Sequence, residues 1–154
     1  FQLMRQVAGR AGRSDKPGVA VLQTHQPEHP VIRAILGGDE EAFWRTEARE
    51  REVAGVPPYG RLVGVVLSSS NEQEAFEVGQ AMARNCMPLT KIGAQVFGPA
   101  PAPVARIRGR HRVRLLVKAD KSVSIQTALT EWTAQFKLPK SLRLSIDIDP
   151  QSFY

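Results

Sequence analysis

Over residues 59–149 the chain shows six segments with strand or helix periodicity, and their order constrains the fold more than any other feature. Apolar residues at alternate positions or in short runs predict strands, and apolar residues three or four apart predict helices. The predicted order is strand 62–67, helix 71–87, strand 92–97 resuming at 104–108, strand 110–118, helix 122–136 and strand 142–148. This β-α-β-β-α-β order predicts an α+β fold, a ferredoxin-like (split β-α-β) domain with two helices on one face of the sheet.

Glycine and proline residues set the limits of these segments. Pro88 marks the end of the first helix, residues 98–103 (Gly-Pro-Ala-Pro-Ala-Pro) interrupt the second strand, and Gly109 turns that strand into the third. In the last strand, apolar and polar residues alternate strictly. This strand should therefore be half-buried, with Asp147 and Asp149 on the solvent face.

The first 56 residues are organised differently. Residues 2–9 predict a short helix, and residues 19–22 (Val-Ala-Val-Leu) predict a strand buried on both faces of a mostly parallel sheet, as at the end of a RecA-like motor lobe. Two helices are predicted next, at residues 29–36 and 40–54, the second of them capped by Asp39. We therefore expect three parts: the end of a RecA-like lobe at residues 1–26, a helical connector at 27–56 and the ferredoxin-like domain at 57–154.

The net charge of +6 is concentrated in one segment. Between Val104 and Lys121, seven cationic residues stand against Asp120, a local sum of +6, so the rest of the chain sums to zero. Five of the seven fall at every second position: Arg106, Arg108, Arg110, Arg112 and Arg114. Arginines at this spacing share one face of a strand, so these five, here called the basic ridge, are expected to contact nucleic-acid phosphates around the turn. No aromatic residue interleaves with them, which favours backbone contact over base readout. An ordinary solvated sheet face, paired with the aspartates of the last strand, is the alternative.

The composition favours a packed core and argues against a membrane span, a disulfide and a histidine metal site. Hydrophobic residues make up 42% of the chain, which supports a packed core, and Trp44 and Trp132 lie at helix positions typical of core packing. No apolar run approaches the roughly 20 residues of a membrane span. The single cysteine, Cys86, rules out an internal disulfide, and the three histidines are too scattered for a metal site. Because the chain begins at Phe1 rather than Met, we expect it to be the C-terminal piece of a longer, cytoplasmic protein.

Residues 6–13 (Gln-Val-Ala-Gly-Arg-Ala-Gly-Arg) form the most specific motif. Its glycines keep side-chain bulk away from whatever the two arginines hold, and arginine suits bidentate recognition of phosphate oxygens. The pattern Gln-x-x-Gly-Arg-x-Gly-Arg resembles motif VI of superfamily 2 helicases, in which the glutamine and both arginines face the nucleotide. A Gly/Arg-rich loop that binds any anion, or a solvated turn, is the alternative.

Further motifs extend over the rest of the chain. They are residues 18–24 followed by Pro30-Val31-Ile32, the spacing Phe43…Glu47…Arg51…Pro57-Pro58-Tyr59, residues 98–102, residues 108–112, and the final Asp147-Ile148-Asp149-Pro150. Together with residues 6–13 they resemble the C-terminal end of the primosomal protein N′ (PriA) family of replication-restart helicases. The resemblance covers essentially the whole chain.

The resemblance implies a 3′-to-5′ ATP-dependent DNA helicase that recognises abandoned forks and helps to reload the replicative helicase. It implies that the parent protein binds ATP and Mg²⁺, that Gln6, Gly9, Arg10 and Arg13 face the nucleotide, and that Arg10 and Arg13 act in its hydrolysis. The family's ATP-binding P-loop, acidic Mg²⁺ motif and cysteine-rich zinc insertion are not in this sequence. We therefore expect no ATP hydrolysis and no bound zinc in this chain alone.

The resemblance also implies binding partners. These are DNA as forks and single strands, primosome assembly proteins, and the acidic-hydrophobic C-terminal tail of the single-stranded-DNA-binding protein. Lys121 and Gln126, at the start of the second helix of the C-terminal domain, are the candidate contacts for that tail, although simple helix-start chemistry explains Lys121 equally well. The alternative function is a stand-alone nucleic-acid-binding module of ribosomal-protein type without enzymatic activity.

Overall fold

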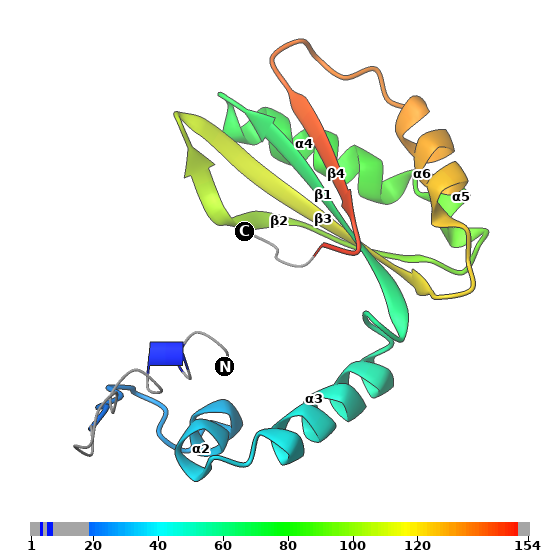
Figure 1. Cartoon of the computed structure of the whole chain (residues 1–154). Coiled ribbons are helices and arrows are strands. Elements are labelled where there is room, and N and C mark those ends of the chain that lie inside the picture. The colour runs from blue at the N-terminus through cyan, green and yellow to red at the C-terminus, as the bar shows by residue number, and fades with distance from the viewer. Residues whose placement is uncertain (1–3, 5, 8–18, 151–154) are drawn as a thin grey trace. The chain divides into compact units, whose positions relative to one another are not determined.

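The computed structural model of the chain describes residues 4, 6, 7 and 19–150 (Figure 1). Its contacts divide the chain into two units, Phe1–Glu50 and Arg51–Tyr154. Most of the predicted helix 2–9, together with Gly9, Arg10 and Arg13, lies outside the described residues.

Two helices follow one another in the first part of the described chain, α2 at Pro30–Gly37 and α3 at Glu40–Ala54. His29 caps α2, because its Nδ1 accepts a hydrogen bond from the Val31 N–H at 3.2 Å. Gly38, with a φ of 70°, ends α2 in the left-handed conformation that glycine adopts without strain. Asp39 then caps α3 by accepting a bond from the Ala42 N–H at 2.9 Å. Both helices are confirmed close to their predicted bounds.

Two features expected for this part of the chain are not found in its described residues. Residues 19–22 form no strand, and Val19 and Val21 are 84% and 89% exposed. A buried strand needs neighbouring strands to satisfy its peptide groups, and the described residues of this unit contain none. Trp44 does not pack in a core either: α3 buries none of its residues, and the indole N–H of Trp44 donates to Glu40 Oε1 at 3.2 Å.

The second unit is a four-stranded antiparallel sheet with helices (Figure 1). The strands are β1 (Gly60–Ser69), β2 (Gln95–Ile107), β3 (Arg110–Asp120) and β4 (Arg143–Ile148), and their order in the sheet is β2-β3-β1-β4. The helices are α4 (Glu72–Arg84), the short α5 (Met87–Thr90) and α6 (Ile125–Ala134). The α+β class is therefore confirmed, and β2 and β4 lie at opposite edges of the sheet.

One face of the sheet carries the core. Alternate residues of β1 and β3, among them Val65 and Leu115, are fully buried and pack with α4 and α6. Trp132 of α6 is also fully buried, as predicted, and its indole N–H donates to the Met82 carbonyl of α4 at 3.1 Å. This bond satisfies the polar atom of the largest buried side chain and ties the two helices together. No described helix is long and apolar enough to cross a membrane.

Several element limits differ from prediction. Helix α4 ends at Arg84, and Pro88 lies in the first turn of α5. Proline is tolerated there because the N–H groups of a first helical turn make no hydrogen bond within the helix. Strand β2 is continuous through residues 98–103, with register shifts between Phe97 and Ala100 and between Pro101 and Arg106. Prolines are tolerated there because β2 is an edge strand.

Asp149 is partly buried in an ion pair, whereas the strand alternation predicted a solvent-facing side chain. Strand β4 ends at Ile148, and Asp149 has a φ of 51°, so the alternation stops one residue earlier. The Asp149 carboxylate pairs with Arg61 at 2.8 Å and accepts the Leu62 N–H at 3.0 Å. Asp149 thus holds the end of β4 to the start of β1.

Candidate nucleic-acid interface

The β2–β3 hairpin presents two arginines of the basic ridge at its tip. Its turn consists of Arg108 and Gly109, which have φ values of 48° and 77°, and it is flanked by the pair Ile107 and Arg110. Positive φ at both central residues is the signature of the type I′ turn, whose twist matches that of antiparallel strands. Arg106 and Arg108 are exposed there.

Arg110 is held by the rest of the domain. Its Nε donates to Ser68 Oγ at 3.0 Å, and its Nη2 donates to the carbonyls of Ser68 at 2.5 Å and Ser141 at 2.6 Å. These acceptors lie at the end of β1 and before β4. Arg110 therefore binds three segments together, and its side chain is half-buried rather than displayed.

The other ridge residues lie on the sheet face opposite the core, called the open face below. Arg112 and Arg114 pair in register with Ser68 and Val66 of β1, and residues directly opposite one another share a face. Both arginines are half-buried, and Arg112 Nη1 donates to the Val104 carbonyl at 3.3 Å. His111 directly precedes Arg112 in the strand and so lies on the opposite face of the sheet. Its Nδ1 lies 3.6 Å from Glu72 Oε2 at the start of α4.

The register adds residues to the open face that the basic ridge did not include. Lys118 lies opposite Leu62 and Gln95, and Leu116 lies opposite Gly64 and Phe97. From β4, Arg143 and Asp147 pair with Ser68 and Gly64 and therefore share this face.

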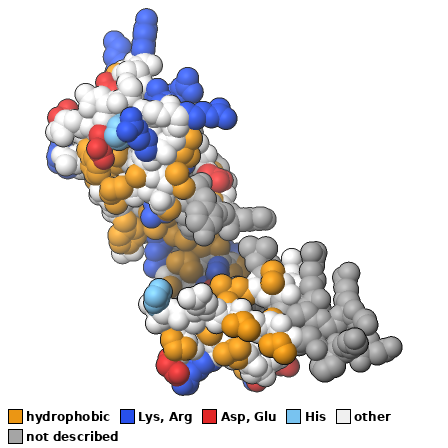
Figure 2. All heavy atoms as spheres, turned by 90° about the vertical axis from the view of Figure 1, so that its left-hand side faces the viewer, with side chains coloured by type: hydrophobic (Ala, Val, Ile, Leu, Met, Phe, Trp, Pro, Cys, Tyr) orange, Lys and Arg blue, Asp and Glu red, His pale blue; other side chains and the backbone are white. Residues whose placement is uncertain are grey.

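The charged side chains of the open face are predominantly cationic, and they stand among apolar residues such as Val66 and Leu116. Arg112, Arg114, Lys118 and Arg143 stand there with the carboxylate of Asp147, which lies towards the β4 edge. Figure 2 shows Lys and Arg side chains projecting from the C-terminal unit. Cationic side chains on central strand β3, on edge strand β4 and at the hairpin tip suit a ligand with repeated negative charge.

A small carboxylate site holds the hairpin side of the domain together. Glu74 of α4 accepts bonds from the Ser69 hydroxyl at 2.5 Å and from the Ser141 hydroxyl at 2.8 Å. These bonds, with a smaller contribution from the charge of Arg110, lower the pKa of the Glu74 carboxyl below its ordinary value. Together with the bonds of Arg110, they fix the loop before β4 against β1 and α4.

The residues predicted for a protein tail lie near the start of α6. Lys121 is exposed in the turn after β3, and Gln126 is exposed in the first turn of α6. The turn is shaped by Asp120, whose carboxylate accepts from the Ser122 hydroxyl at 2.6 Å and the Ser122 N–H at 2.9 Å. The same two bonds lower the pKa of the Asp120 carboxyl. This Asp-turn geometry accounts for the local conformation around Lys121 without a ligand.

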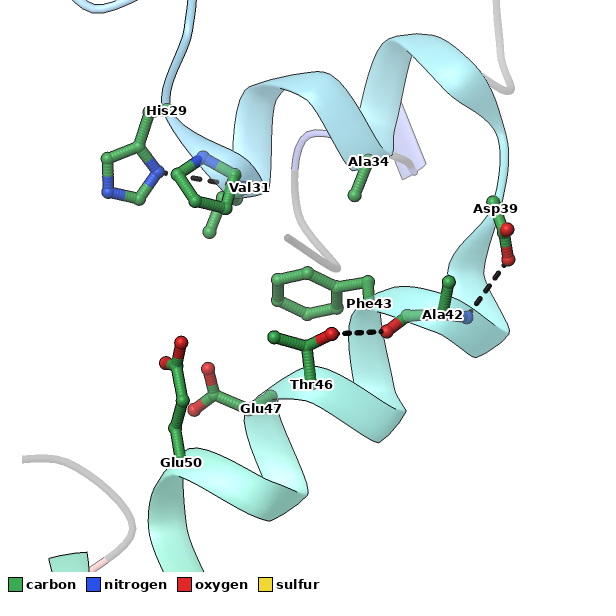
Figure 3. A pocket seen from close by; sticks show the side chains of 10 residues that line it. His29, Val31, Ala34, Asp39, Ala42, Phe43, Thr46, Glu47 and Glu50 are labelled. Atoms are coloured by element: carbon green, nitrogen blue, oxygen red, sulfur yellow. Dashed lines mark hydrogen bonds between the residues drawn. The ribbon is translucent and has the colours of Figure 1, made fainter. Parts of the chain in front are cut away.

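The first unit contains a separate hollow of about 370 Å³ between α2 and α3. Figure 3 shows Val31, Ala34 and Phe43 within it, His29 at one end, and the carboxylates of Glu47 and Glu50 extending from α3. Those carboxylates disfavour a phosphate-bearing ligand. The lining of the hollow therefore gives no support for phosphate binding there.

Of the four predicted nucleotide-contacting residues, only Gln6 is described, and it is exposed in a helical turn. Gly9, Arg10 and Arg13 lie outside the described residues. Sequence reasoning missed Phe97 and Arg143 on the open face. Their places could have been found only from the pairing of β2 with β3 and of β4 with β1.

Comparison with known proteins identifies the C-terminal unit. A family profile described as the primosomal protein N C-terminal domain matches residues 52–151. The chain belongs to this family. The match confirms the resemblance to the primosomal protein N′ family that the sequence motifs indicated.

Relatives of this family align with nearly the whole chain. The replication restart protein PriA of Rickettsia felis is 39% identical over 154 residues, which are 100% of this chain and 23% of that protein. The protein of the same name from Synechocystis sp. is 40% identical over 152 residues, 99% of this chain and 18% of that protein. The one from Bacillus subtilis is 33% identical over 157 residues, 97% of this chain and 19% of that protein. This chain thus spans less than a quarter of the length of these relatives.

Proposed function

We propose that the chain is the C-terminal part of an ATP-dependent 3′-to-5′ DNA helicase that acts in replication restart and primosome assembly in the cytoplasm. The observation that carries this proposal is the alignment of relatives named replication restart protein PriA with the whole chain, including residues 6–13. An accidental Gln-x-x-Gly-Arg-x-Gly-Arg motif in a stand-alone ribosomal-type module does not account for that alignment.

Within this proposal, residues 1–26 end a RecA-like motor lobe, residues 27–56 connect it, and residues 57–154 form a ferredoxin-like domain. The β-α-β-β-α-β chain order and the strand order β2-β3-β1-β4 support the last assignment. The exposed apolar residues 19–22 support the first, because they would be covered by strands of the lobe in the longer protein.

The proposed role of residues 6–13 is in the parent's ATP hydrolysis. Gln6, Gly9, Arg10 and Arg13 would face a Mg²⁺-bound ATP held by the rest of the longer protein. A single arginine placed on a transferring phosphoryl group is worth about 10³–10⁵ in rate. Because this chain spans 23% of the Rickettsia felis relative, we expect it to be inactive in ATP hydrolysis on its own.

The proposed role of the C-terminal domain is to bind DNA backbone with the hairpin tip and the open face. Lys121 and Gln126 remain the proposed contacts for the tail of the single-stranded-DNA-binding protein, beside contacts with primosome assembly proteins. The excess of cations over carboxylates on the open face supports the DNA role.

Fluorescence anisotropy of a labelled oligothymidylate across a salt series tests this role. The variant Arg106→Gln/Arg108→Gln removes two exposed charges at the hairpin tip without touching the bonds of Arg110. The slope of log affinity against log salt should fall by about 0.7 for each phosphate that the variant no longer neutralises.

The matched control is Arg45→Gln/Arg49→Gln, which removes the same charge from exposed positions on α3. This control should leave the slope unchanged. Equal slopes for both double variants and the parent would show that the hairpin tip contacts no phosphate. An equal loss in both variants would mean that only net charge matters.

A further inference from the structure

Phe97 is an aromatic side chain at the β2 edge of the open face, beside the cations of β3. It lies on edge strand β2, directly opposite Leu116 of β3, and so on the open face rather than in the core. It is 48% exposed, whereas its neighbour Val96 packs against the core cluster. A single exposed aromatic ring is common on protein surfaces, so a ligand site here depends on the charged residues around Phe97.

Cationic residues flank Phe97 on both sides. Lys118 and Arg114 lie two residues either way along β3 from Leu116, the partner of Phe97. In a regular ladder such diagonal neighbours stand about 7–8 Å away, within reach of long side chains. A base stacked on Phe97 would therefore have a cationic side chain on either side of it along β3.

Small residues keep the surface around Phe97 shallow. Gly64 pairs with Leu116 on the far side from Phe97, and Ala100 pairs with Arg114. Neither residue carries a side chain large enough to cover a planar ligand. The carboxylate of Asp147 lies beyond Gly64, which disfavours phosphates at that end and directs an anionic chain along β2 and β3.

The backbone beside Phe97 is tightly constrained. Gly98 has a φ of 101°, and a Cβ on it would stand 2.8 Å from the Arg114 carbonyl oxygen. The register shift that follows Phe97 is a bulge, a feature that re-aims side chains at strand edges. Phe97 is therefore carried on a backbone that is pressed against β3, which limits the entropy lost when a ligand binds.

We propose that Phe97 is a stacking platform for a base of single-stranded nucleic acid, with Arg114 and Lys118 contacting the flanking phosphates. This inference rests on the proposed DNA-binding function and specifies it as single-stranded and base-contacting. Stacking on an aromatic side chain is independent of sequence, because every base has a π-face, so the site takes any base.

Phe97→Leu and Phe97→Trp test the proposal in the 154-residue chain. Leucine keeps an apolar side chain of similar size without a ring, and tryptophan enlarges the ring. The probes are a labelled oligothymidylate, the same oligomer with abasic sites, and a duplex of equal length. Ile107→Val, on the same strand and 43% exposed, is the control.

Phe97→Leu should weaken binding to the oligothymidylate by about 5- to 150-fold and leave the salt slope unchanged. Both proteins should bind the abasic oligomer and the duplex equally. Phe97→Trp should retain affinity for the oligothymidylate, and binding should quench its tryptophan emission more than that of the parent, which contains only Trp44 and Trp132. Ile107→Val should behave as the parent.

Other outcomes separate the two proposals. If Phe97→Leu binds oligothymidylate as the parent does while Arg106→Gln/Arg108→Gln loses affinity, DNA binding stands and base stacking is wrong. A loss of equal size on all three probes would show that Phe97 only supports the fold or a protein contact. No binding of any probe by the parent would overturn the proposed DNA-binding function itself.

Discussion

Arg108 adopts a backbone conformation that costs energy for any residue other than glycine, asparagine or aspartate. Its φ of 48° is imposed by the two-residue hairpin turn that it shares with Gly109. Arg108→Asn should therefore raise the free energy of unfolding by about 0.5–1 kcal/mol, because asparagine tolerates the left-handed region better. Urea unfolding followed by circular dichroism measures this change.

The control for the turn is Arg106→Asn, which places the same side chain at an exposed strand position two residues earlier. It should not stabilise the domain, because asparagine is disfavoured in strands. A lower stability for Arg108→Asn than for the parent would contradict the argument from backbone strain.

Glu74 predicts a pH dependence of stability. Its hydrogen bonds to Ser69 and Ser141 lower its pKa in the folded state, so its contribution is complete above the ordinary glutamate value of about 4.5. The contribution is lost as the pH falls through the lowered folded value, because the unfolded state then takes up the proton first. Glu74→Gln should therefore show a smaller loss of stability between neutral and acidic pH than the parent.

Urea midpoints at pH 7 and in acid, for the parent and for Glu74→Gln, measure that difference. Ser141→Ala removes one of the two hydroxyl donors and should reduce the pH dependence in part. An identical pH dependence in all three proteins would show that Glu74 is not the titrating group.

At the scale of elements, the close contact of β2 with β3 depends on Gly98. A Cβ there would meet both an unfavourable φ of 101° and the Arg114 carbonyl oxygen at 2.8 Å. Gly98→Ala should lower the free energy of unfolding by roughly 2–4 kcal/mol, the sum of backbone strain and overpacking. Guanidinium unfolding followed by circular dichroism measures it.

Gly93→Ala separates the two causes. Gly93 also has a positive φ, 76°, but a Cβ there would meet nothing within 4 Å. This variant should lose only the backbone term, about 1–2 kcal/mol. If both variants lost the same stability, the contact with β3 would contribute nothing.

The order of elements could be predicted from the sequence, whereas their pairing could not. The strands and helices of residues 60–148 follow the predicted order because each has its own periodicity. The prolines of residues 98–103 broke that signal, since proline indicates the end of a strand unless the strand is known to lie at an edge.

In the candidate site, too, the neighbours of each side chain depend on strand pairing and could not be predicted from the sequence. The spacing of the arginines placed Arg112 and Arg114 on one face, but nothing local showed that Arg110 would reach Ser68 and Ser141. Phe97 lies nine residues before Arg106 in the sequence, and only the pairing with Leu116 brings it between Arg114 and Lys118.

At the scale of the whole molecule, the two tryptophans report on the two units. Trp132 is fully buried in the second unit, and Trp44 is 41% exposed in the first. Trp132→Phe should cost about 1–3 kcal/mol, because it leaves the buried Met82 carbonyl without its donor. Trp44→Phe should change stability by no more than about 0.5 kcal/mol.

Fluorescence distinguishes the two variants as well. The protein with Trp132 alone should emit at short wavelength and shift to the red in a single cooperative transition with urea. The protein with Trp44 alone should emit at long wavelength and be quenched by iodide. Cooperative, blue-shifted emission from Trp44 alone would show that α3 is buried against part of the chain.

The two edges of the sheet differ in what they offer to a neighbouring molecule. Edge strand β2 contains Pro99, Pro101 and Pro103, which have no N–H to donate, whereas β4 at the other edge contains no proline between Arg143 and Ile148. Backbone pairing with another copy is therefore less favourable along residues 99–103 of β2 than along residues 143–148 of β4. If two copies paired along β4, the prolines on the outer β2 edges would oppose the addition of a third copy, and growth into a fibre would be disfavoured.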